Sequence, residues 1–452
     1  MPSAPASPLS RRTLLSSLAL GAAGAAAAVA APSKSPNERL VIAAVGVGGV
    51  GASYLKDLES EDIAFLCDVD HDYAAKAFAK YPKAKQYRDF RKMLGAEKSI
   101  DAVVVATPDH SHAVVAKAAL DLGKHVYCAK PMTRTIAETR ALVKLAKEKR
   151  VATQMSVQTC RSEDSCLTID WIRAGAAGKV REVHVWSDRP VWPQGLERPA
   201  STGNMPPASL DWDLWLGPAP FRPYHKAYHP FAWRGWYDFG TGALGDMGCH
   251  AMHVVVTALG LGAPLRVSAS VAEVRIPLGP GDKPHWSGSR RANLSDSFPH
   301  ASIVTWEFAG GVRVIWYDGG LKPARPAEMG PGAPALAGSG LLFVGDRGVL
   351  STGFTGGEHR LYPESRATEF APPPATIERS KGHYQEWVAA CKGGKPAFCE
   401  FGFGGALTEL VLLGNLAVRG PAGKTLEWDA AAGRTSDAAA NAWISEPYRT
   451  GW

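Results

Sequence analysis

A glycine-rich loop between a predicted strand and a predicted helix constrains this chain more than any other feature. The apolar run Arg39–Val45 leads into Gly46-Val47-Gly48-Gly49-Val50-Gly51, with the spacing G-x-G-x-x-G, and a helical stretch follows over Ala52–Glu59. Gly46 would permit a tight turn, Gly48 a close approach of the backbone to a phosphate, and Gly51 the packing of helix on strand. The order favours a parallel βαβ unit whose helix N-terminus faces an anion.

A carboxylate follows the next apolar run at the position that a dinucleotide-binding unit requires. The run Ile63–Cys67 ends at Asp68, twenty residues after Gly48, where the side chain would accept hydrogen bonds from the adenosine ribose hydroxyls. No arginine follows directly, and a carboxylate repels a 2′-phosphate, so NAD is favoured over NADP. We predict cofactor binding by this acid and by the glycines of the loop, Gly46, Gly48, Gly49 and Gly51. The alternative is a glycine turn in an unrelated doubly wound sheet.

The alternation of strands and helices continues to about residue 160. The strand Ile100–Ala106 ends in Thr107-Pro108-Asp109-His110-Ser111-His112, and the strand His125–Cys128 ends in Ala129-Lys130-Pro131. Ligands of open parallel sheets collect at the carboxyl ends of the strands. A Rossmann domain is therefore predicted over 38–160, with further cofactor contacts from Thr107, Pro108, His110, His112 and Lys130. The two histidines are expected to line the mouth of the nicotinamide site.

The second half of the chain predicts a different architecture. Five apolar or alternating runs read as strands, which predicts an α+β domain over 161–452 with a large, mainly antiparallel sheet. The runs are Val180–Trp186, Leu265–Ile276, Ala301–Phe308, Val312–Tyr317 and Leu341–Val344. The Pro- and Gly-rich segments 278–284 and 323–339 are expected to form mobile surface loops.

A long aromatic segment lies between these two regions. Residues 186–240 hold six of the fourteen tryptophans together with nine prolines, which favours an ordered loop over a linker. Flat aromatic faces suit the C–H faces of sugar rings, and arginine or tyrosine offers donors to hydroxyls. The candidate substrate residues are Trp233, Arg234, Trp236 and Tyr237. The alternative is that these rings form the core of the loop itself.

Four motifs in one order resemble the glucose–fructose oxidoreductase / inositol dehydrogenase / rhizopine catabolism family, Gfo/Idh/MocA. They are the glycine loop, the strand ending in TPDHSH, the strand ending in Lys130-Pro131, and Gly242-Ala243-Leu244-Gly245-Asp246-Met247-Gly248-Cys249-His250. The resemblance covers essentially the whole chain after its first residues. It implies hydride transfer between a nicotinamide and a hydroxyl of a sugar or polyol, and assembly as a homo-oligomer.

The resemblance also implies a catalytic group of Lys130, Asp246 and His250. Oxidation of a carbinol requires a base within hydrogen-bond reach, which suits His250, while Lys130 would stabilise the developing alkoxide. Asp246, four residues before His250, would lie on the same face of a helix. Ala129 stands where the family usually has glutamate, which removes an acidic neighbour of Lys130.

The same helix also permits a metal hypothesis. His250 and His253 have a helical i, i+3 spacing, and Asp246 could serve as a third zinc ligand. No cluster in the sequence offers a fourth ligand, so no metal is predicted.

The N-terminus reads as a leader over 1–31. Arg11-Arg12 precedes eighteen uncharged residues, nine of them alanine, and Ala28-Val29-Ala30 offers a small-x-small cleavage site. This arrangement resembles a twin-arginine leader, which exports folded proteins and would allow a bound cofactor to travel with them. A periplasmic or extracytoplasmic location is therefore expected, without a stable membrane span after cleavage. An ordinary secretory leader and an uncleaved anchor are the alternatives.

Charge and cysteine usage exclude some function classes. The net charge is +7, the 50 basic residues are interspersed with 43 acidic ones, and no basic block carries interleaved aromatics, which argues against nucleic acid as a partner. The seven cysteines form no CxxC pair, so neither a disulfide framework nor a zinc ribbon is indicated. The sequence thus predicts an exported NAD-dependent sugar or polyol oxidoreductase. A glycosidase that transiently oxidises a ring hydroxyl, or a binding protein on a dehydrogenase fold, remains an alternative.

Overall fold

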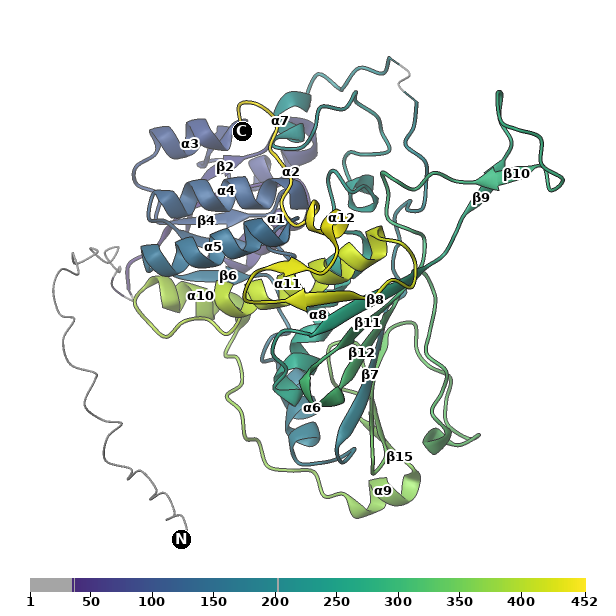
Figure 1. Cartoon of the computed structure of the whole chain (residues 1–452). Coiled ribbons are helices and arrows are strands. Elements are labelled where there is room, and N and C mark those ends of the chain that lie inside the picture. The colour runs from purple at the N-terminus through teal and green to yellow at the C-terminus, as the bar shows by residue number, and fades with distance from the viewer. Residues whose placement is uncertain (1–34, 36, 201–202) are drawn as a thin grey trace, which may run out of the picture.

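The computed structural model describes residues 35, 37–200 and 203–452 and contains two large sheets (Figure 1). A six-stranded sheet comes from the first third of the chain, and a nine-stranded sheet comes from the remainder. The predicted leader over 1–31 lies outside the described residues.

The first sheet is a Rossmann sheet, as predicted. Its strands are all parallel in the order β3-β2-β1-β4-β5-β6, and helices join them. The chain order reverses between β1 and β4, and ligands of such sheets bind in the crevice at this switch point. The elements are β1 (Val41–Val45), α1 (Val50–Asp57), β2 (Asp62–Cys67), α2 (His71–Lys80), β3 (Lys85–Tyr87), α3 (Phe90–Ala96), β4 (Ala102–Val105), α4 (Asp109–Asp121), β5 (His125–Cys128), α5 (Ile136–Lys149) and β6 (Thr153–Met155).

Helices cover both faces of this sheet, which explains why its central strands are uninterrupted apolar runs. In β1, Ala43 and Val45 pack with the helices α3, α4 and α5, whereas Ile42 and Ala44 face α1 and α2. A strand buried on both sides needs apolar residues at every position, because successive side chains point to opposite faces.

A late helix returns to the first sheet. Helix α10 (His383–Cys391) places the fully buried Trp387 in the core formed with α1 and α2. Beyond it, Lys392 forms an ion pair of 2.9 Å with the buried Glu61 before β2. The first domain therefore includes a segment from the 380s, which the division into 38–160 and 161–452 did not anticipate.

The second sheet is mostly antiparallel, as predicted, and it has nine strands. Its order is β15-β14-β13-β7-β12-β11-β8-β16-β17, and β7 and β12 form its parallel pair. Helices α6, α8 and α11 pack on one face. The elements are α6 (Glu163–Arg173), β7 (Val180–Trp186), α8 (Gly242–Leu259), β8 (Arg266–Val271), β11 (Ser302–Glu307), β12 (Arg313–Tyr317), β13 (Gly340–Gly345), β14 (Val349–Thr352), β15 (Arg360–Tyr362), α11 (Phe401–Arg419), β16 (Leu426–Asp429) and β17 (Arg434–Thr435).

The other face of this sheet is covered in part by the segment 323–339. Met329 is buried there against Trp186 and Leu342, and Trp186 Nε1 donates to the Ala337 carbonyl over 2.9 Å. Most of this segment is exposed, as expected of a surface loop, and its apolar side chains anchor it to the sheet at Met329.

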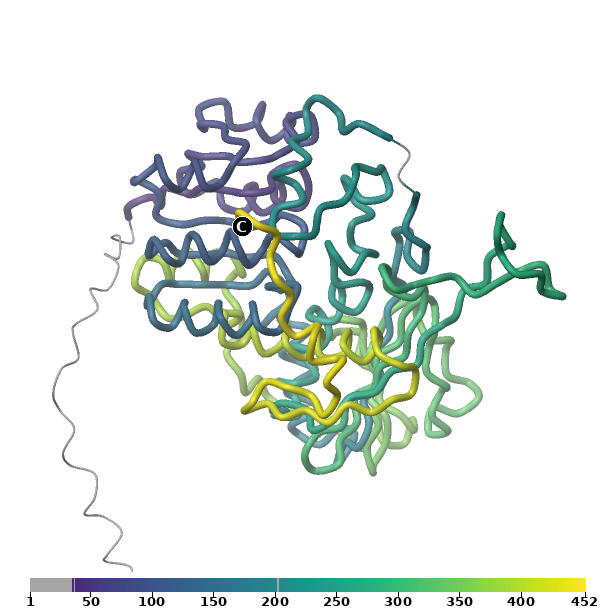
Figure 2. Tube along the Cα trace, turned by 45° about the horizontal axis from the view of Figure 1, so that its top comes forward, coloured from purple at the N-terminus to yellow at the C-terminus, as the bar shows by residue number. Residues whose placement is uncertain are grey.

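The segment 278–284 belongs to a hairpin that projects from the body (Figure 2). Its strands are β9 (Arg275–Pro277) and β10 (Ser289–Arg291), and the connection between them is mostly exposed, with Trp286 93% exposed. The remaining elements are the helices α7 (Trp212–Leu216), α9 (Glu364–Glu369) and α12 (Ala438–Asn441) and the 3-10 turns Ala232–Gly235, Ala309–Gly311 and Ala327–Met329.

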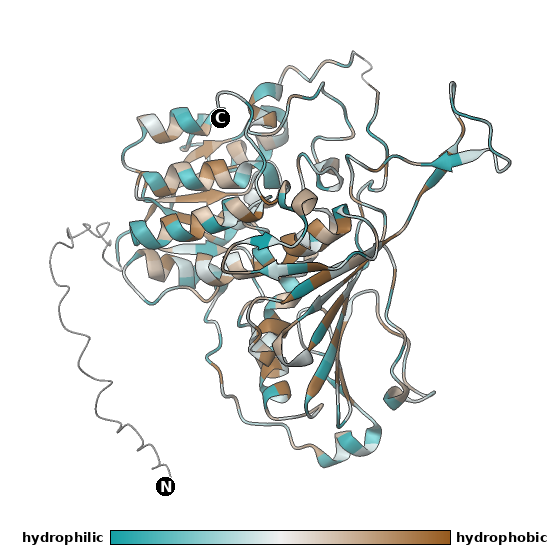
Figure 3. Ribbon diagram, viewed as in Figure 1, coloured by the Kyte–Doolittle hydropathy of each residue, from teal (hydrophilic) through white to brown (hydrophobic). Residues whose placement is uncertain are grey.

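Among the described residues, α11 has the length and composition of a membrane-crossing helix. Most of its residues are buried against α5, α8, β8 and β11, and Figure 3 shows it as a largely apolar helix inside the fold. Such burial is typical of a core helix, so its hydropathy is weak evidence for a span.

We expect Gly51→Ala to destabilise the first domain, because a Cβ at this position would lie 2.0 Å from the Gly46 carbonyl oxygen. Relief of this contact requires a shift of α1 from β1, at a loss in unfolding free energy of about 1–3 kcal/mol. Thermal unfolding followed by circular dichroism should show a lower Tm. Gly95→Ala is the control, since no atom lies within 4 Å of its Cβ and alanine favours the helix α3. An unchanged Tm for Gly51→Ala would contradict the assigned packing.

Candidate active site

A cavity of about 290 Å³ lies at the carboxyl ends of β1, β2, β4 and β5. One wall comes from the Rossmann domain and the other from the aromatic segment and the start of α8. The lining residues are Gly46, Gly48, Gly49, Val50, Tyr54, Asp68, Val69, Tyr73, Ala106, Thr107, Pro108, Asp109, His112, Ala129, Lys130, Trp215, His229, Pro230, Phe231, Trp233, Arg234 and Asp246.

Three glycines of the loop, Gly46, Gly48 and Gly49, line the cavity. Gly46 has φ +85°, a left-handed conformation that favours glycine, and a Cβ there would lie 2.6 Å from the Ala106 carbonyl oxygen. Gly51 is buried against Gly46 instead of lining the cavity, so its role is the helix–strand contact predicted for it. The loop brings its backbone to the cavity at Gly48 and Gly49, where the Tyr73 ring packs so closely that a Cβ on Gly48 would lie 2.2 Å from it.

Asp68 holds this loop in place. Its Oδ2 accepts hydrogen bonds from the Val47 and Gly48 N–H groups over 2.8 and 3.0 Å, and its Oδ1 accepts one from the Asp70 N–H over 3.0 Å. Burial raises the pKa of Asp68, although these hydrogen bonds oppose that effect. A carboxylate at this position both shapes the loop and remains at the cavity wall.

These residues fit a dinucleotide. Helix α1 begins at Val50 without a side-chain cap, so the start of the helix can face phosphate oxygens, while the Ala52 N–H already donates to the Gly49 carbonyl over 3.1 Å. The cavity then runs from Asp68 to Lys130, past the strand ends at Thr107 and Ala129. The uncapped helix N-terminus offers hydrogen-bond donors to a pyrophosphate. The buried carboxylate of Asp68 beside it offers an acceptor to the hydroxyls of a ribose.

Lys130 and Asp246 meet at the opposite end of the cavity. Lys130 Nζ donates to Asp246 Oδ1 over 2.7 Å and to the Asp246 backbone carbonyl over 2.5 Å, while Arg234 Nε lies 3.5 Å from the same Oδ1. Burial alone would raise the pKa of Asp246, but the charges of Lys130 and then Arg234 outweigh it and lower the pKa. Asp246 therefore remains ionised and holds two cations beside the space for a substrate.

His250 lies one helical turn after Asp246 but does not line the cavity. Burial, and then repulsion from Lys130, lowers its pKa to about 3. The neutral imidazole can accept a proton, yet it is a weaker base in this structure than the near-neutral pKa expected from the sequence would make it. Its catalytic role stays a prediction.

The zinc hypothesis finds no support in this helix. His253 is buried and its Nε2 lies 3.2 Å from Thr159 Oγ1. Across residues 35, 37–200 and 203–452, no three His, Cys, Asp or Glu side chains gather in a way that could hold a metal ion.

Besides Gly51 and His250, three further predicted site residues lie away from the cavity. His110 is 1% exposed, with its ring nitrogens 3.2 Å from the Phe239 carbonyl and 2.9 Å from the Trp215 carbonyl, and burial lowers its pKa to about 4. Trp236 is buried in the aromatic segment, where its Nε1 donates to the Ala227 carbonyl. Tyr237 packs on Phe298 in a different cluster.

The other predicted residues do line the cavity: Thr107, Pro108, His112, Trp233 and Arg234 join the glycines, Asp68, Lys130 and Asp246 there. His112 lies on the cavity side of α4, with its Nε2 2.8 Å from the Thr107 carbonyl. The Arg234 guanidinium packs on the rings of Trp233 and Phe231, at 4.2 and 4.5 Å from their centroids.

The structure adds residues that the sequence analysis did not select. Asp109 accepts a 2.6 Å hydrogen bond from Thr241 Oγ1, and burial raises its pKa. It lies inside the TPDHSH motif, which was a signal available in the sequence. Tyr73, Trp215 and His229 had no such signal, because they reach the cavity only through the folding of distant segments.

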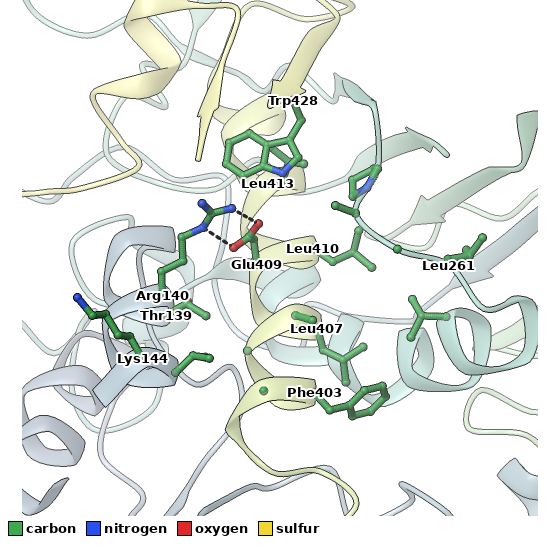
Figure 4. A pocket seen from close by; sticks show the side chains of 18 of the residues that line it. Thr139, Arg140, Lys144, Leu261, Phe403, Leu407, Glu409, Leu410, Leu413 and Trp428 are labelled. Carbon is green, nitrogen blue, oxygen red and sulfur yellow. Dashed lines mark hydrogen bonds and ion pairs between the residues drawn. The ribbon is translucent and has the colours of Figure 1, made fainter. Parts of the chain in front are cut away.

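A second, larger cavity of about 630 Å³ lies elsewhere, between α5, α11 and the loop after α8 (Figure 4). Apolar residues such as Leu410 and Leu413 line most of it, and Arg140 pairs with Glu409 at 2.7 Å on its wall. None of its lining residues belongs to the Lys130–Asp246 site.

Two segments of the chain match the models of one oxidoreductase family. Residues 40–157 match its NAD-binding Rossmann fold, and residues 192–274 match its C-terminal alpha/beta domain. The first match contains the glycine loop, Asp68 and Lys130, and the second contains Arg234, Asp246 and His250.

Curated relatives are similar over a part of the chain. A levoglucosan dehydrogenase of Pseudarthrobacter phenanthrenivorans is 30% identical over 115 residues, which cover 25% of this chain and 29% of the relative. A glycosyl hydrolase family 109 protein of Shewanella amazonensis is 31% identical over 160 residues, covering 32% and 34%. The chain thus matches about a third of the length of these relatives.

Solved structures share the fold over most of both chains. The WlbA dehydrogenase of Bordetella pertussis, solved with NADH and UDP-GlcNAcA, aligns with a TM-score of 0.58 at 16% identity and covers 87% of this chain and 99% of its own. The likeness supports the two-domain architecture.

Proposed function

We propose that this chain, whose residues 40–157 and 192–274 belong to the Gfo/Idh/MocA oxidoreductase family, is an exported NAD-dependent oxidoreductase of sugars or polyols. The observation that carries the proposal is the cavity that joins the glycine loop and Asp68 at one end to Lys130 and Asp246 at the other. NAD supplies a hydride acceptor when bound.

Lys130 is the residue that would act on the substrate hydroxyl. Its ammonium lies at the cavity wall within 2.7 Å of the ionised Asp246, so it can donate a hydrogen bond to the hydroxyl and stabilise the negative charge that develops on that oxygen. Asp246 orients the ammonium, and the neutral His250 behind it is the candidate acceptor of the proton.

Hydrogen bonds through Ser156 hold the backbone at Lys130, although the glutamate usual before this lysine is absent. Ser156 Oγ accepts a 3.0 Å hydrogen bond from the Lys130 N–H, and Tyr54 Oη lies 3.0 Å from the same Oγ. Tyr54 and Ala129 both line the cavity. These contacts hold the backbone of the Lys130-Pro131 turn, so the loss of the acid does not by itself argue for a binding protein without activity.

Export would require the enzyme to keep its cofactor. A compartment outside the cytoplasm holds little free nucleotide, so we propose that NAD is tightly bound and reoxidised within a catalytic cycle or by a second substrate. The leader over 1–31 supports the location, and the resemblance to the family supports a homo-oligomer. Both remain proposals.

A glycosidase is the second candidate function. The similarity to a glycosyl hydrolase family 109 protein favours it specifically. Such an enzyme would oxidise a ring hydroxyl to a ketone, eliminate the aglycone, add water to the unsaturated ketone and then reduce the ketone again with the same hydride, using the same Lys130 and Asp246. It would not need the carboxylate pair of other glycosidases.

The first test is the nucleotide content of the protein. We expect protein purified without added nucleotide and then denatured to release NAD or NADH in near-stoichiometric amount, as identified by mass spectrometry. Sugars or polyols added to the native protein should raise the NADH absorbance. Release of the aglycone from an aryl glycoside without lasting NADH would favour the glycosidase. A protein that is empty and does not bind added NAD or NADP would refute both functions.

A further inference from the structure

The aromatic segment crosses from the second sheet back to the Rossmann domain at the end of β2. Leu210 forms an antiparallel bridge with Asp70, and the Asp211 N–H donates to the Val69 carbonyl over 2.9 Å. Arg88 Nη1 adds a 2.7 Å hydrogen bond to the Ser209 carbonyl from outside the cavity. In Figure 1 the segment around α7 lies beside α2.

A buried contact between His229 and Asp70 fastens the segment at a second point. His229 Nε2 lies 2.8 Å from Asp70 Oδ2, and both side chains are 9% exposed. The Tyr73 ring stands edge-on to the His229 ring at 5.8 Å between centroids. Burial opposes ionisation of Asp70, but hydrogen bonds from His229 and from the Tyr73 N–H outweigh it and lower the pKa of Asp70. The pair is therefore held across the two domains, two residues from Asp68.

The segment has a rigid core behind these contacts. Trp212 and Trp215 stack with 4.5 Å between ring centroids, and Trp215 packs against His229. The C-terminal end of the chain supports the same region, because the Arg449 N–H donates to the Pro218 carbonyl over 3.0 Å and its side chain pairs with Asp213. The wall that this segment gives the cavity is therefore preformed.

We propose that residues 207–234 act as a clasp that retains the dinucleotide, with Asp70 and His229 as its latch. The inference rests on the proposed function, since it requires that NAD binds in this cavity. His229, Phe231 and Arg234 line the same cavity as Gly48 and Gly49, and the Tyr73 ring lies between the glycines and His229, so a dinucleotide in this cavity would contact both the loop and the clasp. Release then requires the clasp to open, and the contacts at Asp70 and Arg88 oppose that opening.

The test measures how fast bound NADH leaves the protein that lacks only the predicted leader over 1–31. NADH fluorescence is followed after a large excess of NAD is added, for the wild type and for His229→Ala. We expect release to accelerate by about tenfold to a hundredfold, the range for loss of one charge-assisted hydrogen bond. His229→Gln keeps a donor toward Asp70 and should restore much of the retention.

Two further variants separate a clasp from a direct contact to the nucleotide. Arg88→Ala removes a tie that lies outside the cavity and should also accelerate release. His225→Ala is the matched control, because His225 lies in the same segment, accepts a hydrogen bond from the Ala227 N–H and does not line the cavity. It should release NADH at the wild-type rate.

The outcomes are distinct. Wild-type protein that never binds NADH refutes the proposed function, and the clasp with it. Binding with unchanged release in both His229→Ala and Arg88→Ala overturns the clasp alone. Circular dichroism establishes that each variant is folded, and if His229→Ala does not fold, the release rate of Arg88→Ala decides the question.

Discussion

Replacement of Lys130 by methionine should lower kcat/KM for a sugar or polyol by about 10²- to 10³-fold, the usual range for loss of one donor to a developing oxyanion. The methionine keeps most of the length of the side chain but cannot donate to the substrate oxygen. It also removes the hydrogen bonds to the Asp246 carboxylate and carbonyl, so that Arg234 is left as the nearest cation to Asp246. NADH titration should show an affinity close to that of the wild type.

A lysine at the other end of the same strand provides the control. Lys124 precedes β5, and its Nζ contacts the Lys98 carbonyl, outside the cavity. Lys124→Met should retain full activity and a wild-type Tm. If Lys130→Met is folded, binds NADH and still turns over at the wild-type rate, Lys130 does not act on the substrate.

Replacement of Asp68 by asparagine should weaken NADH binding by about tenfold to a hundredfold. The carboxylate accepts hydrogen bonds from two N–H groups of the glycine loop, Val47 and Gly48, and a charged acceptor is worth about 1.5–3 kcal/mol per bond. An amide presents only one acceptor oxygen, and its NH₂ group would face a backbone donor. The shape of the loop under the pyrophosphate would change as a result.

The same substitution should shift the choice of cofactor. Loss of the negative charge removes the repulsion against a 2′-phosphate, so the ratio of NADPH to NADH affinity should rise. Asp62→Asn at the exposed start of β2 is the control and should change neither affinity. Equal losses for NADH and NADPH would contradict the assignment of Asp68 to the ribose.

The Rossmann half could be predicted from sequence because its rules are local. The central strands β1 and β4 are continuous apolar runs, and the glycine spacing places a turn, a phosphate approach and a helix contact within six residues. The second sheet was harder. Its strand β8 ends at Val271, not at Ile276, and the edge strands β14 to β17 were not predicted, because two to four residues carry too little periodicity.

Local sequence patterns do not identify all residues of the candidate site. His110 and His112 look alike in the motif, but residues two apart on a helix point in different directions, so His112 reaches the cavity while His110 is buried under the aromatic segment. The turn Ala232–Gly235 separates Trp233 and Arg234 from Trp236 in the same way. The partnership of Asp70 with His229 joins positions 159 residues apart, which no spacing in the sequence encodes.

Direct detection of hydride transfer tests whether this protein oxidises sugars or polyols with bound NAD. The mature protein, loaded with NAD, is incubated with ring-deuterated sugars and then denatured, and the released nucleotide is analysed by mass spectrometry. We expect deuterium on the nicotinamide in the wild type and labelling slower by about 10²- to 10³-fold in Lys130→Met, and the glycosidase would give the same label transiently. A wild-type protein that holds NAD and binds a sugar but never transfers the label would refute the proposed oxidoreductase function.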